Sequence, residues 1–335
     1  MKELLQNYIN NLSKSSFYSI TNINNIKDLD EIYAAVISSK FRKSKILLDD
    51  EFDIKNKLKE FINQKTPIEF SIPFGAYKSW KLATNFVPEW AEVFHLSYLV
   101  QYAASILKVY PYGINFTYTY SDDIMYFVSD IPKNKIKQYL LDFYQLLQIF
   151  NQIDERIKFN IIKINDLYDS NECYYMDFLD CFLDNLVFWD SKYNIETKNR
   201  HIKSAHNNLY PFGEKQINKQ PKEIQEKYYY YSALMTDAVD CLKERRKFNK
   251  DQKRIQLVGV KGPSKSINIG ACETSTVHFW VGRGCMSINK RKLKPFVYTS
   301  SNWIKLKEEG KIEEYFIESI FSSINNNYKK IEFIL

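Results

Sequence analysis

The stretch INFTYTYSDDIMYFVSD, residues Ile114–Asp130, carries the pattern on which the interpretation of the fold depends. In Ile114–Tyr120, apolar or aromatic residues alternate with asparagine and threonine, which is the two-residue period of a β-strand. Ile124–Val128 is a second short run of aliphatic and aromatic residues, so the pattern predicts a hairpin with Asp122 and Asp123 in its turn. These two carboxylates are either a turn or part of a site.

Strands and helices alternate on both sides of this stretch. Pro67–Pro73, PIEFSIP, predicts a strand, and Pro88–Leu107 predicts a helix with a proline and glutamates in its first turn. Pro132–Phe150 has the spacing of another helix, and Arg156–Ile164, RIKFNIIKI, that of another strand. This order predicts an α/β fold with a Rossmann-like mixed sheet flanked by helices, to which the hairpin adds antiparallel character.

The remaining segments suggest how the chain is divided. Its 335 residues exceed the usual size of one domain, and we expect an N-terminal helical segment at 1–64 and an α/β catalytic-type domain at 65–335. A helical insertion is expected at about 170–250 within that domain. The elements predicted after it are strands at Arg254–Val260, Thr276–Val281 and Ile331–Leu335 and a helix at Lys307–Ser323.

Composition excludes several classes of protein. Hydrophobic residues make up 45% and charged residues 26%, which is the balance of a globular chain. No stretch approaches the roughly 18 consecutive apolar residues of a membrane span, and Met1–Lys14 lacks the features of a secretory signal, so we expect a cytoplasmic protein. The five cysteines are far apart and no histidine–carboxylate grouping has zincin spacing, which favours free thiols and no metal site.

Positive charge is concentrated in one part of the chain. The net charge is +7, and Cys241–Ser300 contains fourteen basic residues against three acidic ones. A local basic surface implies an anionic partner, which could be a nucleic acid, a membrane surface or a small phosphate ester. Charge alone does not choose between these partners.

Three groups of residues could carry chemistry. The segment VGVKGPSKSINIG, Val258–Gly270, has glycines and two lysines that could cradle a phosphate, although an ordinary loop between strands fits it as well. Glu89 and Glu92 would share one face at a helix start, where they either compensate the helix dipole or act as a carboxylate pair. On a strand, His278 and Trp280 would share a face, and His278 is either a packed residue or a proton carrier.

The order of the segments resembles a known family, the pyoverdine/dityrosine biosynthesis family of isocyanide (isonitrile) synthases. That family has a Pro-Asp-x-Ala-Glu segment at a helix start and Ser-Asp-Gly-Arg at a strand end. The similar residues here are Ile72-Pro73-Phe74, Lys78, Lys81, Pro88–Glu92 (PEWAE), the turn Tyr110–Gly113 and Ser121-Asp122. Later in the chain, Arg254–Leu257 is similar to the family's Ile-Arg-Leu-Ser strand, Ser264–Gly270 to its Ser-Lys loop, and Ser275–His278 to its Thr-Pro-Trp-His.

The resemblance implies an enzyme that converts the α-amine of an amino acid, typically tyrosine or tryptophan, into an isonitrile. The carbon would come from ribulose 5-phosphate, with no metal or redox cofactor, and an iron and 2-oxoglutarate-dependent oxygenase could act later in the same pathway. Such chemistry requires an anion site, a base and walls that exclude water. The residues implied are Arg254, Lys261 and Lys265 for phosphate, Lys78 or Lys81 for carboxylate, Glu89 or Glu92 for the amine, and Asp122 or His278 for protons.

Two other interpretations compete with this one. A nucleic-acid-binding protein could use the basic surface at 243–294, although the chain has no RNA- or DNA-binding signature and its remainder is acidic. A non-catalytic relative could bind an amino acid or a partner protein, because Ser121–Ile124 reads Ser-Asp-Asp-Ile and lacks the family's arginine.

Overall fold

The computed structural model describes residues 2–13, 26–82, 86–245, 254–259, 266–290 and 292–335. Its helices are α1 (Lys2–Ser13), α2 (Leu29–Val36), α3 (Leu48–Gln64), α4 (Trp90–Leu107), α5 (Asp122–Ser129), α6 (Lys133–Phe150), α7 (Asn171–Lys192), α8 (Ile195–Asn208), α9 (Lys222–Arg245) and α11 (Ser300–Glu308). Its strands are β1 (Ile68–Pro73), β2 (Ile114–Tyr120), β3 (Ile157–Lys163), β4 (Ile255–Val258), β5 (Ser266–Asn268), β6 (Gly282–Asn289), β7 (Lys292–Thr299), β8 (Ile312–Phe316) and β9 (Lys330–Ile334). Within these ranges, no helix has both the length and the apolar character needed to cross a membrane.

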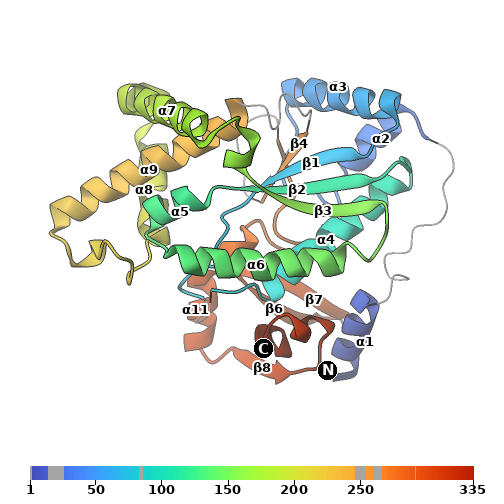
Figure 1. Cartoon of the computed structure of the whole chain (residues 1–335). Helices are drawn as coiled ribbons and strands as arrows, with labels where there is room; N and C mark the ends of the chain where they lie inside the picture. Colours follow the sequence, from blue (N-terminus) through green and yellow to red (C-terminus); the bar gives the residue numbers. More distant parts are fainter. Residues whose placement is uncertain (1, 14–25, 83–85, 246–253, 260–265, 291) are drawn as a thin grey trace.

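A parallel sheet forms the centre of the fold (Figure 1). Its strand order is β3-β2-β1-β4-β5, and each neighbouring pair runs parallel. The chain moves from β1 through α4 to β2 and through α6 to β3, and it later adds β4 and β5 on the other side of β1. The predicted α/β class is therefore confirmed. The carboxyl ends of β1 and β4 flank the topological switch point, where ligands tend to bind in open α/β sheets.

The predicted hairpin is wrong. β2 ends at Tyr120, and the next segment forms helix α5 instead of a second strand. Met125 and Val128, which lie three residues apart on one face of a helix, pack into an apolar cluster with residues of α7 and α9. The sequence Ile124–Val128 is compatible with either a strand or a helix, and this packing favours the helix. The chain therefore passes through two helices before it enters the next parallel strand.

A second sheet follows in the C-terminal part, with the order β7-β6-β9-β8. The helix predicted at Lys307–Ser323 is wrong, because α11 ends at Glu308 and Gly310 adopts a φ of +67° before β8 begins. The strand predicted at Thr276–Val281 is also wrong, since Phe279–Val281 is a single turn of 3₁₀ helix. The predicted final strand is confirmed as β9.

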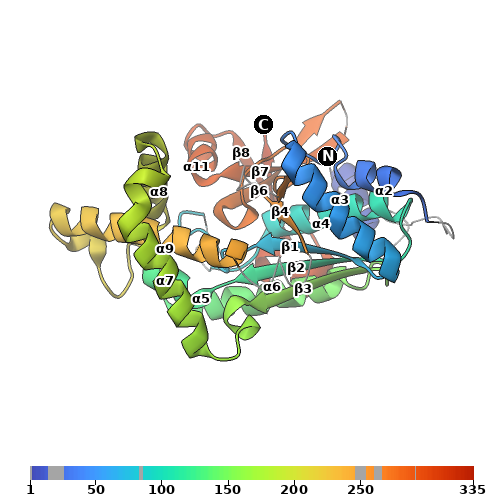
Figure 2. The same ribbon diagram turned by 90° about the horizontal axis from the view of Figure 1, so that it is seen from above.

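Helix α4 lies between the two sheets, and nearly all of its side chains are buried. On the face of the parallel sheet that α4 and α6 cover, Phe70, Phe116 and Phe159 are register partners on three strands. Their rings are stacked, with centroid distances of 5.4 Å and 5.2 Å. Figure 2 shows the other face, with α3 toward one end and α7 and α9 toward the carboxyl ends of the strands.

Candidate active site

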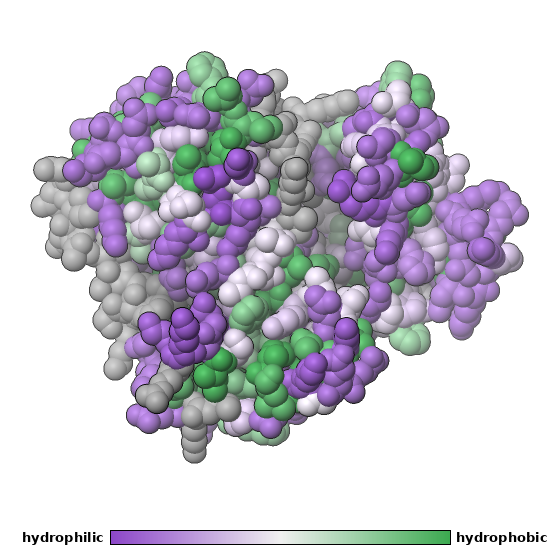
Figure 3. Space-filling model, turned by 180° about the vertical axis from the view of Figure 1, so that it is seen from behind, coloured by the Kyte–Doolittle hydropathy of each residue, from purple (hydrophilic) through white to green (hydrophobic). Residues whose placement is uncertain are grey.

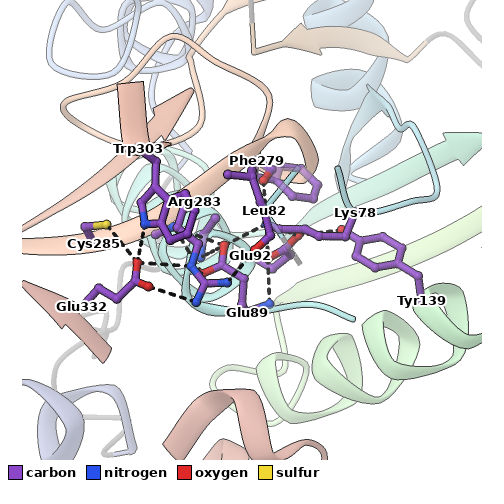
Figure 4. Close-up of polar contacts among 12 residues, drawn as sticks. Lys78, Leu82, Glu89, Glu92, Tyr139, Phe279, Arg283, Cys285, Trp303 and Glu332 are labelled. Carbon is purple, nitrogen blue, oxygen red and sulfur yellow. Dashed lines mark hydrogen bonds and ion pairs between the residues drawn. The ribbon is translucent and has the colours of Figure 1, made fainter. Parts of the chain in front are cut away.

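Lys78, in the segment that follows β1, has a fully buried ammonium group with three acceptor groups around it (Figure 4). Its Nζ lies 2.8 Å from Glu89 Oε1, 3.1 Å from Glu92 Oε1 and 3.1 Å from the carbonyl oxygen of Phe279. Tyr139 of α6 donates a hydrogen bond of 2.7 Å to Glu92 Oε1. We call Lys78, Glu89, Glu92 and Tyr139 the Lys78 network.

The two glutamates of this network also begin helix α4. Glu89 is the N-cap residue and accepts from the backbone N–H of Ala91, while Glu92 accepts from the backbone N–H of Glu89. This reciprocal arrangement satisfies N–H groups that have no partner within the helix. The two carboxylates thus cap the helix, as one interpretation of the sequence predicts, and they also neutralise a buried lysine.

Arg283 of β6 extends the charged group on the side of the C-terminal sheet (Figure 4). Its Nε and Nη2 each lie 3.2 Å from an oxygen of Glu332, and its Nε lies 3.9 Å from Glu89 Oε2. Glu332 also accepts from the indole N–H of Trp303 at 2.6 Å. No spacing pattern in the sequence relates Arg283, Glu332 or Tyr139 to Lys78, so these residues are not among the predicted site residues.

Burial and neighbouring charges set the protonation of this group. Burial raises the pKa of Glu92, and the adjacent Lys78 ammonium opposes that shift. For Arg283, burial lowers the pKa, but the carboxylates of Glu89 and Glu332 outweigh it and the net shift is upward. The neighbouring carboxylates therefore favour the charged guanidinium of Arg283, and Glu92 takes up a proton at a higher pH than an ordinary glutamate does.

His278 and Trp280 lie at the switch point. Their rings stack at 4.3 Å with an interplanar angle of 19°. A Cβ on Gly75, just after β1, would lie 2.3 Å from Trp280 Nε1, and a Cβ on Gly259, just after β4, would lie 2.9 Å from His278 Nδ1. Glycine at both strand ends therefore leaves room for this ring pair between the carboxyl ends of β1 and β4, the position that open α/β sheets use as a ligand crevice.

The other proposed site residues lie apart from these groups or outside the described ranges. Asp122 begins α5 at the carboxyl end of β2, and its carboxylate lies 2.8 Å from the Nζ of Lys163. Arg254 precedes β4 at the amino end of the sheet and lies 3.4 Å from Glu69. Lys81 is half-buried with its ammonium over the Trp80 ring, and burial lowers its pKa. Lys261 and Lys265 lie outside the described residues.

Two further findings bear on the alternatives from the sequence. Arg254 and Arg283, both counted in the basic segment, are in ion pairs with glutamates, so these two charges are not part of an open basic surface. Within the described ranges, no group of three or more histidine, cysteine, aspartate or glutamate residues could hold a metal ion.

Gly284 of β6 is where the C-terminal sheet meets the start of α4. A Cβ there would lie 2.3 Å from the backbone nitrogen of Ala91, and the Gly284 N–H lies 3.1 Å from Glu89 Oε1. We expect Gly284→Ala to lower the free energy of unfolding by about 1–3 kcal/mol, because backbone atoms must separate. Urea denaturation measures this loss, and Ser287→Ala on the same strand should stay within about 0.5 kcal/mol of the wild type. An equal effect of both substitutions would contradict this close contact.

The fold and these groups define an α/β protein with a buried charged network beside the switch point of its parallel sheet. Among solved structures, it is similar to the crystal structure of the PvcA protein from Pseudomonas aeruginosa, with a TM-score of 0.64 and 15% sequence identity. The match covers 91% of this chain and 100% of that chain, so the likeness of fold extends over both sheets. A scan against models of protein families finds no match, and a search of curated proteins finds none either.

Proposed function

We propose that this protein is a biosynthetic enzyme of specialised metabolism that converts the α-amine of an amino acid into an isonitrile, with ribulose 5-phosphate as the carbon donor. The observation that carries this proposal is the contact among Lys78, Glu89 and Glu92. These three residues belong to segments that resemble the family, and they are up to fourteen residues apart in the sequence. The likeness in fold to PvcA, which extends over 91% of this chain, supports it at the level of the fold.

In this proposal the Lys78 network positions other groups and does not itself bind the amino acid. The Lys78 ammonium already has acceptors in Glu89, Glu92 and the Phe279 carbonyl oxygen. Lys81 is then the cation that binds the substrate carboxylate. The bond from Lys78 to the Phe279 carbonyl holds the backbone next to His278, so the network orients the imidazole at the switch point.

His278 is the proton carrier in this mechanism. The amine attacks the ketone carbon of the sugar phosphate and water leaves, which gives an imine from which a base must remove a proton. We favour His278 over Asp122 for this step, because His278 lies at the crevice between β1 and β4 whereas Asp122 is paired with Lys163. The aromatic rings of Phe74, Phe279 and Trp280 pack beside the crevice and would help to exclude water.

Isonitrile formation provides the direct test. Purified protein is incubated with each amino acid and with ribulose 5-phosphate carrying ¹³C at its ketone carbon, and products are captured with a tetrazine for mass spectrometry. We expect a labelled isonitrile with at least one amino acid, its loss in His278→Ala and its retention in the exposed control His206→Ala. Absence of product with every amino acid would refute the proposed activity.

Lys81 gives a prediction about substrate binding. Lys81→Ala should raise the KM for the amino acid about tenfold or more with little change in kcat, because a charge-assisted hydrogen bond to the carboxylate is lost. Steady-state kinetics measure both constants. Lys305→Ala, whose side chain is 74% exposed, is the matched control and should leave both unchanged. An unchanged KM in Lys81→Ala would remove Lys81 from the site.

A further inference from the structure

The two faces of the parallel sheet differ in chemistry. One face carries the stacked ladder Phe70, Phe116 and Phe159 under α4 and α6. On the strands of a parallel sheet, both faces are ordinarily apolar because helices cover both. Here the residue that follows each phenylalanine is Ser71, Thr117 or Asn160, and successive side chains on a strand point to opposite faces. At this level of the strands the second face is therefore polar.

This polarity extends across the whole sheet at one level. The register pairs Ser71 with Thr117, Thr117 with Asn160, Ser71 with Gln256 and Gln256 with Ser266. Every strand thus contributes one neutral hydroxyl or amide side chain to a line of neighbours. We call Asn160, Thr117, Ser71, Gln256 and Ser266 the polar row. No charged residue belongs to it, so the row is suited to uncharged hydroxyl groups and not to an anion.

One member of the polar row, Thr117, has unused capacity for hydrogen bonding. The Thr117 side chain is 1% exposed, and its Oγ1 has no hydrogen-bond partner in the part of the chain that is described. Two residues nearer the start of the strands, polar side chains do have hydrogen-bond partners, because Asn115 and Arg254 both donate to Glu69. A buried hydroxyl without a partner costs about 1–3 kcal/mol, so its retention points to a partner that binds.

The polar row is near the switch point, and its face of the sheet lies beneath a hollow in the surface, although Ser71, Thr117 and Gln256 themselves are buried. Figure 2 shows α3 on one side of this face and α7 and α9 on the other, and Figure 3 shows the surface hollowed between these two groups of helices. Asn160 is exposed at one end of the row. From Gln256, β4 continues only two residues to Val258 before Gly259 and the His278 ring, so a ligand on the row can extend toward the crevice.

We infer that the polar row binds the hydroxylated carbon chain of the sugar phosphate, with the ketone carbon directed toward the crevice at His278. This inference rests on the proposed function for the identity of the ligand. It divides the two substrates between the faces of the sheet: the sugar phosphate lies on the polar face, and the amino acid side chain lies toward the aromatic rings of Phe74 and Phe279. The hydroxyl of Thr117 and the amide of Gln256 supply hydrogen bonds to the sugar hydroxyls.

Direct binding tests this inference without requiring turnover. Isothermal titration of ribulose 5-phosphate is carried out on the full chain, on Thr117→Val and on Gln256→Met, which keep side-chain size and remove the polar groups. Each substitution should weaken binding about threefold to tenfold, as expected for one lost hydrogen bond. Thr236→Val on α9, whose hydroxyl bonds to the Ser232 carbonyl oxygen, is the matched control and should bind like the wild type. Inorganic phosphate should bind Thr117→Val and wild type equally.

Thermal unfolding separates a binding role from a structural one. Without ligand, Thr117→Val should unfold at the same temperature as the wild type or higher, because it removes a buried hydroxyl that lacks a partner. With ribulose 5-phosphate, Thr117→Val should show a smaller rise in Tm than the wild type. A clear loss of Tm without ligand, or equal affinity for ribulose 5-phosphate in all variants, would overturn the inference.

The same measurements distinguish this inference from the proposed function. If ribulose 5-phosphate binds in a manner that depends on Thr117 and Gln256 but no isonitrile forms, the inference about the polar row is supported and the proposed activity is refuted. If isonitrile forms while both variants keep the wild-type Kd and KM for ribulose 5-phosphate, the activity stands and the polar row is not its sugar site. If the wild type does not bind ribulose 5-phosphate at all, the inference is wrong.

Discussion

Lys78→Met is expected to lower the free energy of unfolding by about 3–5 kcal/mol, as is typical when one partner of a buried ion pair is removed. Methionine fills a similar volume, so the loss comes from charge and not from a cavity. Glu89 and Glu92 would remain buried side by side without the ammonium that lies 2.8 Å and 3.1 Å from their oxygens. Equilibrium denaturation in urea at pH 7 measures the change.

Two further variants identify the cause of that loss. Lys227→Met removes an exposed lysine that pairs with Glu223, and it should change stability by no more than about 1 kcal/mol because solvent screens the pair. Adding Glu92→Gln to Lys78→Met should recover part of the stability, since one uncompensated charge disappears. Equal effects of Lys78→Met and Lys227→Met would show that the Lys78 network contributes little to stability.

The second large expected effect is a loss of folding stability at low pH. His95 of α4 is buried, its Nδ1 lies 3.0 Å from the Ala271 carbonyl oxygen, and its ring stacks on Phe279 at 4.3 Å. Because a carbonyl oxygen can only accept, Nδ1 carries the hydrogen; Nε2 has no partner among the described residues. Burial lowers the pKa of His95 to about 3, and the neighbouring His278 adds to the shift. The imidazole is therefore neutral in the folded protein at pH 7.

The sign of the pH dependence follows from this shift. Unfolded His95 takes up a proton below a pKa of about 6.5, whereas the folded residue does so only near pH 3. Between these values the unfolded state binds more protons, so stability falls as the pH is lowered, with a limit on the order of 5 kcal/mol. We expect this part of the acid sensitivity to disappear in His95→Phe, which keeps the ring stack and loses the bond to Ala271.

Comparison between variants isolates this effect from that of other groups. Glu92 acts in the opposite direction, because a raised carboxyl pKa gives stability that is lost as the pH rises through it. The difference in unfolding free energy between wild type and His95→Phe, measured from pH 7 to pH 3, removes contributions common to both. Exposed His206→Phe should retain the wild-type profile. If His95→Phe retains it as well, His95 is not the source of the acid sensitivity.

The short run at Ile124–Val128 shows where sequence patterns are ambiguous. Five aliphatic or aromatic residues in a row fit a strand, and they also fit a helix that packs on two sides. The helix is favoured because Met125 and Val128 pack against residues of α7 and α9, which lie far along the chain. The error at Lys307–Ser323 differs in kind, because Gly310 was a local stop signal that periodicity alone overlooked.

The prediction for His278 and Trp280 combines success and failure. The segment is not a strand, yet the two rings do lie together, as the alternation predicts. Their position at the switch point depends on Gly75 and Gly259, which come from the ends of two different strands. Likewise, Arg283 was counted as part of a basic surface, but it forms an ion pair with Glu332, which lies forty-nine residues further along the chain.

The sequence by itself determined those features that arise within a few residues. The alternation in β1, β2 and β3, the two crossover helices and the placement of Glu89 and Glu92 at the start of α4 follow from local spacing, because backbone geometry repeats over two or 3.6 residues. Only the tertiary structure decided that these glutamates enclose Lys78, that Tyr139 and Gly284 complete the group, and that five polar side chains form one row across the sheet. Such contacts join residues distant in sequence, and they depend on strand order and on the packing of both sheets against α4, which no local pattern specifies.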